Sequence, residues 1–139
     1  YDPIAINFPS YVKKVSLENL VASSDVITVH VHVSEKTKGM INKKIINLFK
    51  FGCIFINTSR AELTDENALV SALESGRISA LGVDVLKGEP LIKNNPIWQY
   101  ANTHENVHIS PHIGGFCPDA VKKVVGFTAK RILHYFKSS

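Results

Sequence analysis

Short apolar runs alternate with amphipathic stretches along the chain, and this alternation limits the possible fold more than any other feature. Runs rich in β-branched and apolar residues predict strands, and they lie at residues 25–31, 53–57, 78–85 and 107–110. Helical patterns lie at residues 17–23, 43–49, 65–75 and 118–139. Strands that alternate with helices in this way indicate a parallel, doubly wound α/β sheet.

Individual residues define some of these elements more closely. Ser16 is a suitable N-cap for the first helix, and Gly76 is a suitable stop for the third. The run from Cys53 to Asn57 is apolar nearly throughout, which is typical of a strand buried on both faces. Residues 12–15 favour a further short strand. The apolar face of the last helix consists of Val121, Val124, Val125, Ala129, Ile132, Leu133 and Phe136.

Composition narrows the class of protein and its partners. The 139 residues, 45% hydrophobic and 20% charged, are typical of one soluble globular domain. No apolar run approaches the roughly 20 residues that cross a bilayer, so no membrane partner is expected. The net charge is +4, but the basic residues are scattered singly and in pairs, so no nucleic-acid partner is expected either. Cys53 and Cys117 are expected to be buried thiols in a reducing cytosol.

The residues that follow the strands are the first candidates for function, because ligands of doubly wound sheets sit at the carboxyl ends of strands. Arg60 follows the second strand closely, where a guanidinium on a rigid backbone could grip a carboxylate bidentately. A salt bridge to a neighbouring helix is the structural alternative for this side chain. Asp84 and Glu89 follow the third strand, and two solvated loop carboxylates are the alternative there.

His112 follows the fourth strand in a segment of prolines and glycines that allows close approach of a ligand. A histidine at this point can act as an acid or a base near neutral pH, although a loop histidine is often inert. Glu89 beside His112 would hold its tautomer, while Arg60 held an anion next to it. Such a set is suited to polarising a keto acid and protonating its oxygen. His30 and His32 would share a strand face, but no ligand spacing accompanies them, so no metal site is predicted.

Five groups of residues, in order and at characteristic spacing, extend over nearly the whole chain. They are Ser24-Asp25-Val26-Ile27-Thr28-Val29-His30, Ile56-Asn57-Thr58-Ser59-Arg60, Asp65-Glu66, Gly82-Val83-Asp84-Val85 with Glu89-Pro90, and Ser110-Pro111-His112-Ile113-Gly114. Together they resemble the D-isomer-specific 2-hydroxyacid dehydrogenases. The resemblance implies a Rossmann-like fold and an NAD-dependent oxidoreductase that interconverts a small D-2-hydroxy acid and its 2-keto acid. Arg60 would bind the substrate carboxylate, His112 would be the general acid or base, and Glu89 would be its orienting partner.

The resemblance also implies which residues contact NAD. Asp84 would meet the nicotinamide carboxamide, and Asp2 would hydrogen-bond the adenosine ribose, which would favour NAD over NADP. The full set is Asp2, Val31, His32, Thr58, Ser59, Arg60, Asp84, His112 and Gly114. The sequence departs from the family pattern at His32-Val33, at Ala61-Glu62 and at Phe116-Cys117-Pro118. These departures leave the adenine pocket and the substrate preference open.

No G-x-G-x-x-G occurs in the 139 residues. In the resemblance that loop and the first strand lie upstream, and a start at Tyr1 without an initiator Met agrees with a missing segment there. We therefore expect residues 1–139 to be part of the NAD-binding domain of a cytoplasmic, homodimeric enzyme, without its separate substrate domain and with residues 118–139 as the C-terminal helix. The alternative is a non-catalytic, NAD-responsive binding module of the corepressor type, which keeps the same catalytic residues.

Overall fold

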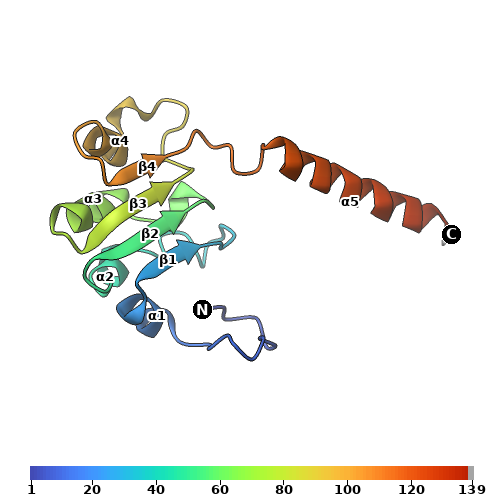
Figure 1. Ribbon diagram of the computed structural model, residues 1–139, viewed down its shortest axis with the longest axis horizontal. Coiled ribbons are helices and arrows are strands. Elements are labelled where there is room, and N and C mark those ends of the chain that lie inside the picture. Colours follow the sequence, from blue (N-terminus) through green and yellow to red (C-terminus); the bar gives the residue numbers. More distant parts are fainter. Residues whose placement is uncertain (138–139) are drawn as a thin grey trace.

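The computed structural model describes residues 1–137, in which four parallel strands form one sheet (Figure 1). The strands are β1 (Val26–Val29), β2 (Cys53–Asn57), β3 (Ile78–Val83) and β4 (Val107–Ile109). Each pairs with the next one along the chain, so the four predicted strands are confirmed in the spatial order β1-β2-β3-β4. The strand predicted at residues 12–15 is wrong, because this segment is largely exposed and pairs with no described strand.

The described part of the chain contains five α-helices, of which the first precedes β1, and the sequence predicts four of the five. They are α1 (Leu17–Ser23), α2 (Lys43–Ile46), α3 (Glu66–Glu74), α4 (Pro96–Ala101) and α5 (Pro118–Lys137). Ser16 caps α1 as predicted, because its hydroxyl accepts a hydrogen bond from the Asn19 amide at 3.2 Å. The helix that the sequence missed is α4. Residues 138–139 of the last predicted helix lie outside the described residues.

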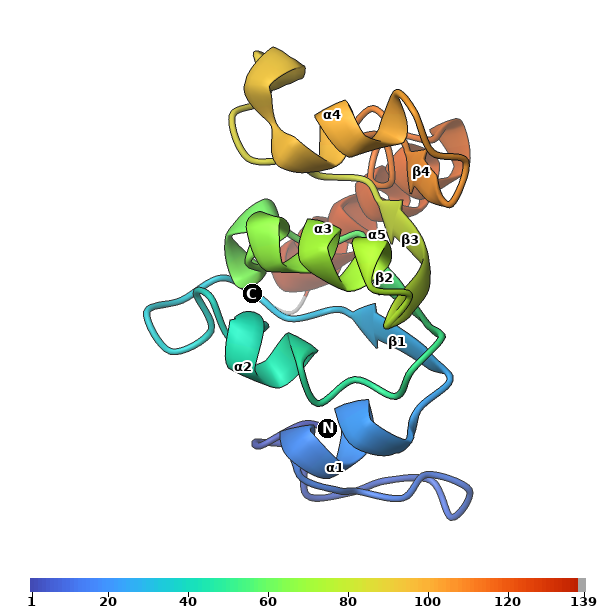
Figure 2. The same ribbon diagram turned by 90° about the vertical axis from the view of Figure 1, so that its left-hand side faces the viewer.

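Helices α1 to α4 lie on one face of the sheet, as Figure 2 shows. Each crossover leads to the next strand in the same direction, and right-handed crossovers in one direction put every connecting helix on the same side. A doubly wound sheet contains a point where the strand order reverses, and these four strands contain none. The chain therefore holds a Rossmann-like half of such a sheet, with β1 as an edge strand paired to β2 alone.

The hydrophobic core lies between this sheet face and the four helices. Phe55 of β2, Leu69 of α3 and Ile97 of α4 belong to one cluster, and none is more than 1% exposed. Burial of one such side chain contributes about 1.5 to 3 kcal/mol to folding. The expectation that Cys53 to Asn57 is buried on both faces is wrong, because Ile54 is 38% exposed. Ile54 alternates with the buried Cys53 and Phe55 along β2, so it lies on the other face of the sheet, and Figure 2 shows α1 to α4 on one face only.

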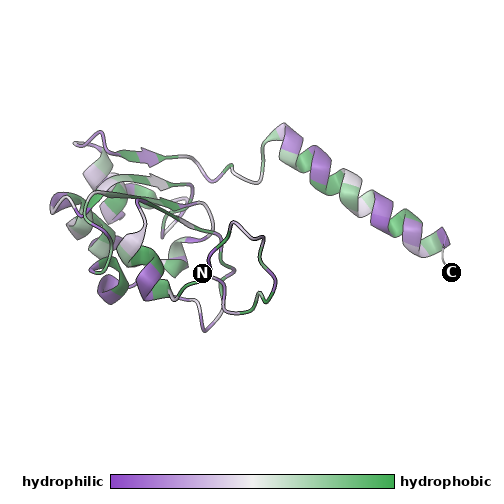
Figure 3. Cartoon of the chain, turned by 60° about the horizontal axis from the view of Figure 1, so that its bottom comes forward, coloured by the Kyte–Doolittle hydropathy of each residue, from purple (hydrophilic) through white to green (hydrophobic). Residues whose placement is uncertain are grey.

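Helix α5 projects away from the sheet (Figure 1), and none of its residues is buried. The predicted apolar face is present but open to solvent, since Val125 is 62% and Phe136 is 73% exposed. Figure 3 shows apolar and polar residues side by side along this helix. Cys117, just before α5, is exposed as well, so the expectation of two buried thiols is correct for Cys53 and wrong for Cys117.

Candidate active site

Arg60 lies in the turn after β2, and the buried side chain of Asn57 shapes this turn. Asn57 Oδ1 accepts a hydrogen bond from the Ser59 amide at 3.0 Å, and Asn57 Nδ2 donates to the Arg60 carbonyl oxygen at 2.9 Å. The Ser59 hydroxyl donates to the Val29 carbonyl oxygen at 2.8 Å, which ties the turn to β1. Arg60 Nη1 donates to the Ser59 carbonyl oxygen at 2.7 Å. Within residues 1–137 the guanidinium makes no ion pair, so the alternative of a structural salt bridge finds no support there.

Glu89 and His112 form a hydrogen-bonded pair from two different loops. His112 Nδ1 lies 2.6 Å from Glu89 Oε2. The other carboxylate oxygen, Glu89 Oε1, accepts a hydrogen bond from the Leu86 amide at 2.5 Å, which fixes the carboxylate within its own loop. The two side chains are 45% and 30% exposed, so a ligand can reach the pair. A carboxylate on Nδ1 leaves Nε2 of a protonated imidazole as a donor toward that ligand.

Asp84 holds the loop that carries His112. Its Oδ1 accepts hydrogen bonds from the Ser110 hydroxyl at 2.5 Å and the Ile113 amide at 3.1 Å, and its Oδ2 accepts one from the Gly114 amide at 2.9 Å. His112 lies between these donors with a φ of 54°, a left-handed conformation that few residues other than glycine adopt. Burial by itself raises the pKa of Asp84, but the three hydrogen bonds and nearby His112 outweigh burial and lower that pKa below 3.8.

Glu66, the first residue of α3, holds the loop that carries Glu89. Its Oε1 accepts a hydrogen bond from the Lys87 amide at 2.8 Å, and its Oε2 accepts one from Asn95 Nδ2, also at 2.8 Å. Asn95 Oδ1 also accepts the amides that begin α4, so one buried carboxylate joins α3, the Glu89 loop and α4. Sequence reasoning missed this cluster. An asparagine followed by Pro96 is a signal for a helix start that could have found α4.

Two neighbouring pockets share Arg60 and Glu62. The first, of about 380 Å³, brings the three predicted catalytic side chains together, since Arg60, Glu89 and His112 all line it. The second, of about 470 Å³, is lined by His30, Val31, His32, Val33, Ser59, Arg60 and Glu62. An arginine between a histidine–carboxylate pair and a second cavity can orient an anionic ligand that reaches from one pocket into the other.

The predicted cofactor residues are only partly brought together. Five of them line one or both pockets: Val31, His32, Ser59, Arg60 and His112. Asp84 and Gly114 contact each other beside His112, and Thr58 is exposed in the turn before Arg60. Asp2 lines neither pocket and ends no strand. Its carboxylate accepts hydrogen bonds from the amides three and two residues further on, which lower its pKa.

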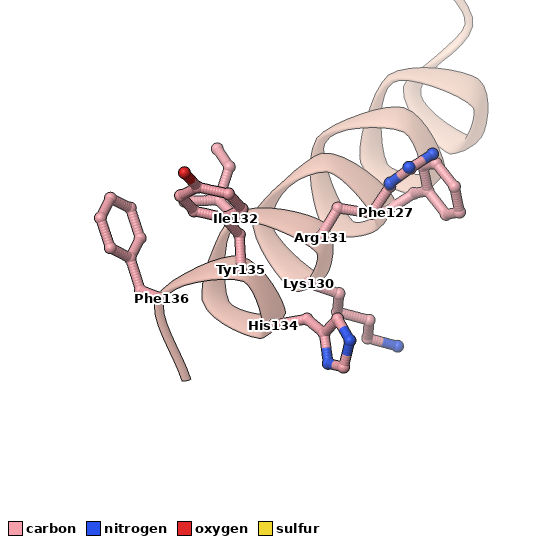
Figure 4. Close-up of a pocket in the computed structure, with 7 residues that line it drawn as sticks. All are labelled: Phe127, Lys130, Arg131, Ile132, His134, Tyr135 and Phe136. Carbon is pink, nitrogen blue, oxygen red and sulfur yellow. The ribbon is translucent and has the colours of Figure 1, made fainter. Parts of the chain in front are cut away.

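A larger hollow, of about 610 Å³, lies on α5 (Figure 4) and is separate from these pockets. It is lined by Phe127, Lys130, Arg131, Ile132, His134, Tyr135 and Phe136. All of these residues belong to one helix, so no second element supplies groups that could converge on a ligand. Among residues 1–137 no cluster of three or more His, Cys, Asp or Glu side chains is arranged to hold a metal ion. The same residues include no helix with the length and apolarity to cross a membrane.

Comparison with known proteins matches most of the chain to a single family. Residues 3–114 match the family model of the D-isomer specific 2-hydroxyacid dehydrogenase, NAD binding domain. The chain is 35% identical over 146 aligned positions to the D-2-hydroxyacid dehydrogenase (NAD+) of Lacticaseibacillus paracasei. That alignment covers 97% of this chain and 44% of the relative.

Solved structures support the same likeness. A D-2-hydroxyisocaproate dehydrogenase superposes with a TM-score of 0.76 at 32% identity, over 94% of this chain and 44% of that one. The D-lactate dehydrogenase from Aquifex aeolicus, complexed with NAD and lactic acid, superposes with a TM-score of 0.68 at 30% identity, over 89% of this chain and 40% of that one. The chain thus spans less than half the length of these relatives, and its Rossmann-like fold is confirmed.

Proposed function

Because the chain belongs to the D-isomer specific 2-hydroxyacid dehydrogenases and matches their NAD-binding domain, we propose that the whole protein is an NAD-dependent oxidoreductase. It interconverts a small D-2-hydroxy acid and the corresponding 2-keto acid. The single observation that carries this proposal is the His112–Glu89 hydrogen bond of 2.6 Å beside Arg60 in one pocket. The names of the relatives support the enzyme over the corepressor alternative.

The three side chains would divide the chemistry among them. Arg60 binds the substrate carboxylate through parallel N–H donors and helps to polarise the adjacent carbonyl. During keto-acid reduction His112 donates its Nε2 proton to the carbonyl oxygen, and during alcohol oxidation it accepts the hydroxyl proton. Glu89 orients the ring through Nδ1 and so fixes which ring nitrogen faces the substrate. The chemistry that the cofactor would supply is hydride transfer: NADH would give a hydride to the carbonyl carbon in reduction, and NAD+ would take it from the same carbon in oxidation.

The residues around the two pockets fit a nicotinamide cofactor in part. We propose that NAD contacts Asp2, Val31, His32, Thr58, Ser59, Arg60, Asp84, His112 and Gly114. The pocket that Val31, His32, Ser59 and Arg60 line supports these four members of the set, because it opens at the carboxyl ends of β1 and β2, where doubly wound sheets bind nucleotides. The pyrophosphate would need the amides of a glycine-rich loop, and no G-x-G-x-x-G occurs in this sequence.

The same proposal extends to the domain organisation, the oligomeric state and the cellular location of the whole protein. These residues form part of an NAD-binding domain, with α5 as its C-terminal helix, in an enzyme whose substrate is held jointly with a separate domain. We propose a homodimer in the cytoplasm, without nucleic-acid or membrane partners. Size-exclusion chromatography with light scattering on the whole protein tests the dimer.

The direct test of function is NADH-dependent reduction of glyoxylate, pyruvate and larger 2-keto acids by the full-length protein. With an active substrate, His112→Ala should lower kcat by about 10²- to 10⁴-fold, the usual contribution of general acid–base catalysis. His108→Ala, which removes an exposed histidine of β4, is the matched control and should retain activity. Unchanged turnover in His112→Ala would remove this residue from the mechanism.

A further inference from the structure

Two buried carboxylates lie behind the proposed catalytic pair, and each contacts one of the two loops that carry it. They are Glu66 and Asp84, which are 5% and 4% exposed. We infer that both are positioning residues: Glu66 fixes the loop of Glu89, and Asp84 fixes the loop of His112. Together they hold the two side chains at hydrogen-bonding distance. This inference rests on the proposed function, since it concerns residues that act through the catalytic pair.

Glu66 acts at the backbone of the Glu89 loop. Both of its oxygens are used, and both partners are donors: the Lys87 amide and Asn95 Nδ2. Lys87 directly follows Leu86, whose amide binds Glu89 Oε1. A shift of the chain at Lys87 would therefore move the contact that orients the Glu89 carboxylate. No cation pairs with Glu66 among residues 1–137, so its burial depends on these donors and on its place at the N-terminus of α3.

Asp84 acts in the same way on the His112 loop. Its three donors flank the histidine, with Ser110 two positions before it and the amides of Ile113 and Gly114 after it. The fit at Gly114 is tight, because a Cβ atom there would lie 2.9 Å from Asp84 Oδ2. The unusual φ of His112, 54°, is held by contacts on both sides of the residue. The carboxylate thus sets the direction in which the imidazole leaves the backbone.

The chemistry of the contacts gives a sharp test. Every partner of the two carboxylates is a donor, and an amide side chain of the same shape accepts on only one of its two ends. In the full-length enzyme, Glu66→Gln should therefore loosen the Glu89 loop with little change in volume. Displacements of about 1 Å can lower rates by about 10²-fold, so we expect kcat for keto-acid reduction to fall by about 10- to 100-fold. The KM for NADH should stay within about twofold, because Glu66 lines neither pocket.

Two controls separate positioning from stability. Glu74→Gln makes the same change at the exposed other end of α3 and should leave kcat unchanged. Leu73→Ala removes a core side chain that is 4% exposed. It should lower the thermal midpoint at least as much as Glu66→Gln but leave kcat within about twofold at temperatures where it is folded. If Glu66→Gln does not fold, Asn95→Ser removes one donor while it keeps an oxygen to cap α4, and kcat should fall in the same way.

Asp84→Asn provides the second arm and should also lower kcat by about 10- to 100-fold. Because Asp84 belongs to the proposed cofactor set, the KM for NADH is expected to rise as well. Wild-type kcat in both Glu66→Gln and Asp84→Asn, from an enzyme that reduces keto acids, would overturn the positioning role alone. A full-length protein that reduces no 2-keto acid would overturn the proposed function and the positioning role with it.

Discussion

Arg60 presents a planar fork of donors on a turn that Asn57 and Ser59 tie to two strands. Arg60→Lys keeps the positive charge but replaces the fork with a point charge, so bidentate contact with a carboxylate is lost. We expect the KM for the keto acid to rise about tenfold or more, equivalent to about 1.4 kcal/mol, with a smaller change in kcat. Arg77→Lys, outside both pockets, is the matched control for steady-state kinetics. An unchanged KM in Arg60→Lys would exclude a bidentate contact.

The lowered pKa of Asp84 makes the free energy of unfolding of the folded chain depend on pH. Burial raises its pKa, but the hydrogen bonds from Ser110, Gly114 and Ile113 lower it more, so the pKa in the folded chain lies below 3.8. A depressed pKa contributes stability that is fully present above about pH 4 and is lost as the pH falls through the folded value. Urea unfolding should therefore show Asp84→Asn to be less stable than wild type at pH 7, and the gap should narrow below about pH 4. A gap that stays constant across this range would contradict the assignment.

At the residue scale the sequence could predict which side chains meet, but not what supports them. Arg60, Glu89 and His112 each follow a different strand, and the carboxyl ends of parallel strands lie on one edge of a sheet. Their common pocket follows from this geometry. The partners of Asp84 and Glu66 lie 21 to 30 residues away along the chain. Such contacts depend on the packing of loops, for which no local pattern exists.

At the scale of an element, helices α4 and α5 also show what a local sequence pattern can and cannot predict. Helix α4 has only six residues, Pro96–Ala101, too few for a clear apolar periodicity. Its N-terminus is instead set by Asn95, whose Oδ1 accepts from the Ile97 and Trp98 amides at 2.9 and 3.2 Å. The long helix α5 has a strong periodicity and could be predicted, but its position relative to the sheet could not. That position depends on what covers its apolar face, which the pattern does not identify.

Asn95 both caps α4 through its Oδ1 and donates a hydrogen bond to Glu66 through its Nδ2. A second asparagine that only caps a helix allows the two contributions to stability to be separated. Asn42 caps α2 through the Lys44 and Ile45 amides and is exposed, so Asn42→Ala should cost about 1 kcal/mol of unfolding free energy. Asn95→Ala should cost about 2 to 3 kcal/mol, because it also leaves one oxygen of Glu66 buried without a donor. Urea unfolding of both variants gives the comparison. Equal losses would show that the contact between Asn95 and Glu66 adds nothing to stability.

At the scale of the whole molecule, the strand order explains which part of the fold was predicted and which was not. Alternating strands and helices predict parallel pairing, and the order β1-β2-β3-β4 agrees with it. The apolar run of β2 predicts cover on both faces, yet Val26 of β1 and Ile54 of β2 are 53% and 38% exposed on the side away from the helices. Among residues 1–137 no strand pairs with the free edge of β1. An apolar edge of this kind favours association with other chains.

The affinity of the chain for NAD also depends on the whole molecule, because a dinucleotide site is assembled from several strands and loops. Tight binding of NAD by a Rossmann-like sheet depends on backbone amides of a glycine-rich loop and a helix N-terminus that hold the pyrophosphate, its most charged part. The 139 residues contain no G-x-G-x-x-G, and the order of the four described strands does not reverse to form the usual crevice. The pocket beside Val31 and Ser59 can contribute only part of a dinucleotide site.

We therefore expect isothermal titration of the 139-residue chain with NAD to give a dissociation constant weaker than about 1 mM, which corresponds to less than about 4 kcal/mol of binding free energy. The chain alone should also fail to reduce 2-keto acids with NADH. The full-length protein, titrated under the same conditions, is the positive control and should bind NAD at least tenfold more tightly. A micromolar dissociation constant from the monomeric chain would mean that these residues hold the pyrophosphate without the glycine loop. In that case Arg60 and Lys87, the cations that line the two pockets, would have to supply a different anion site.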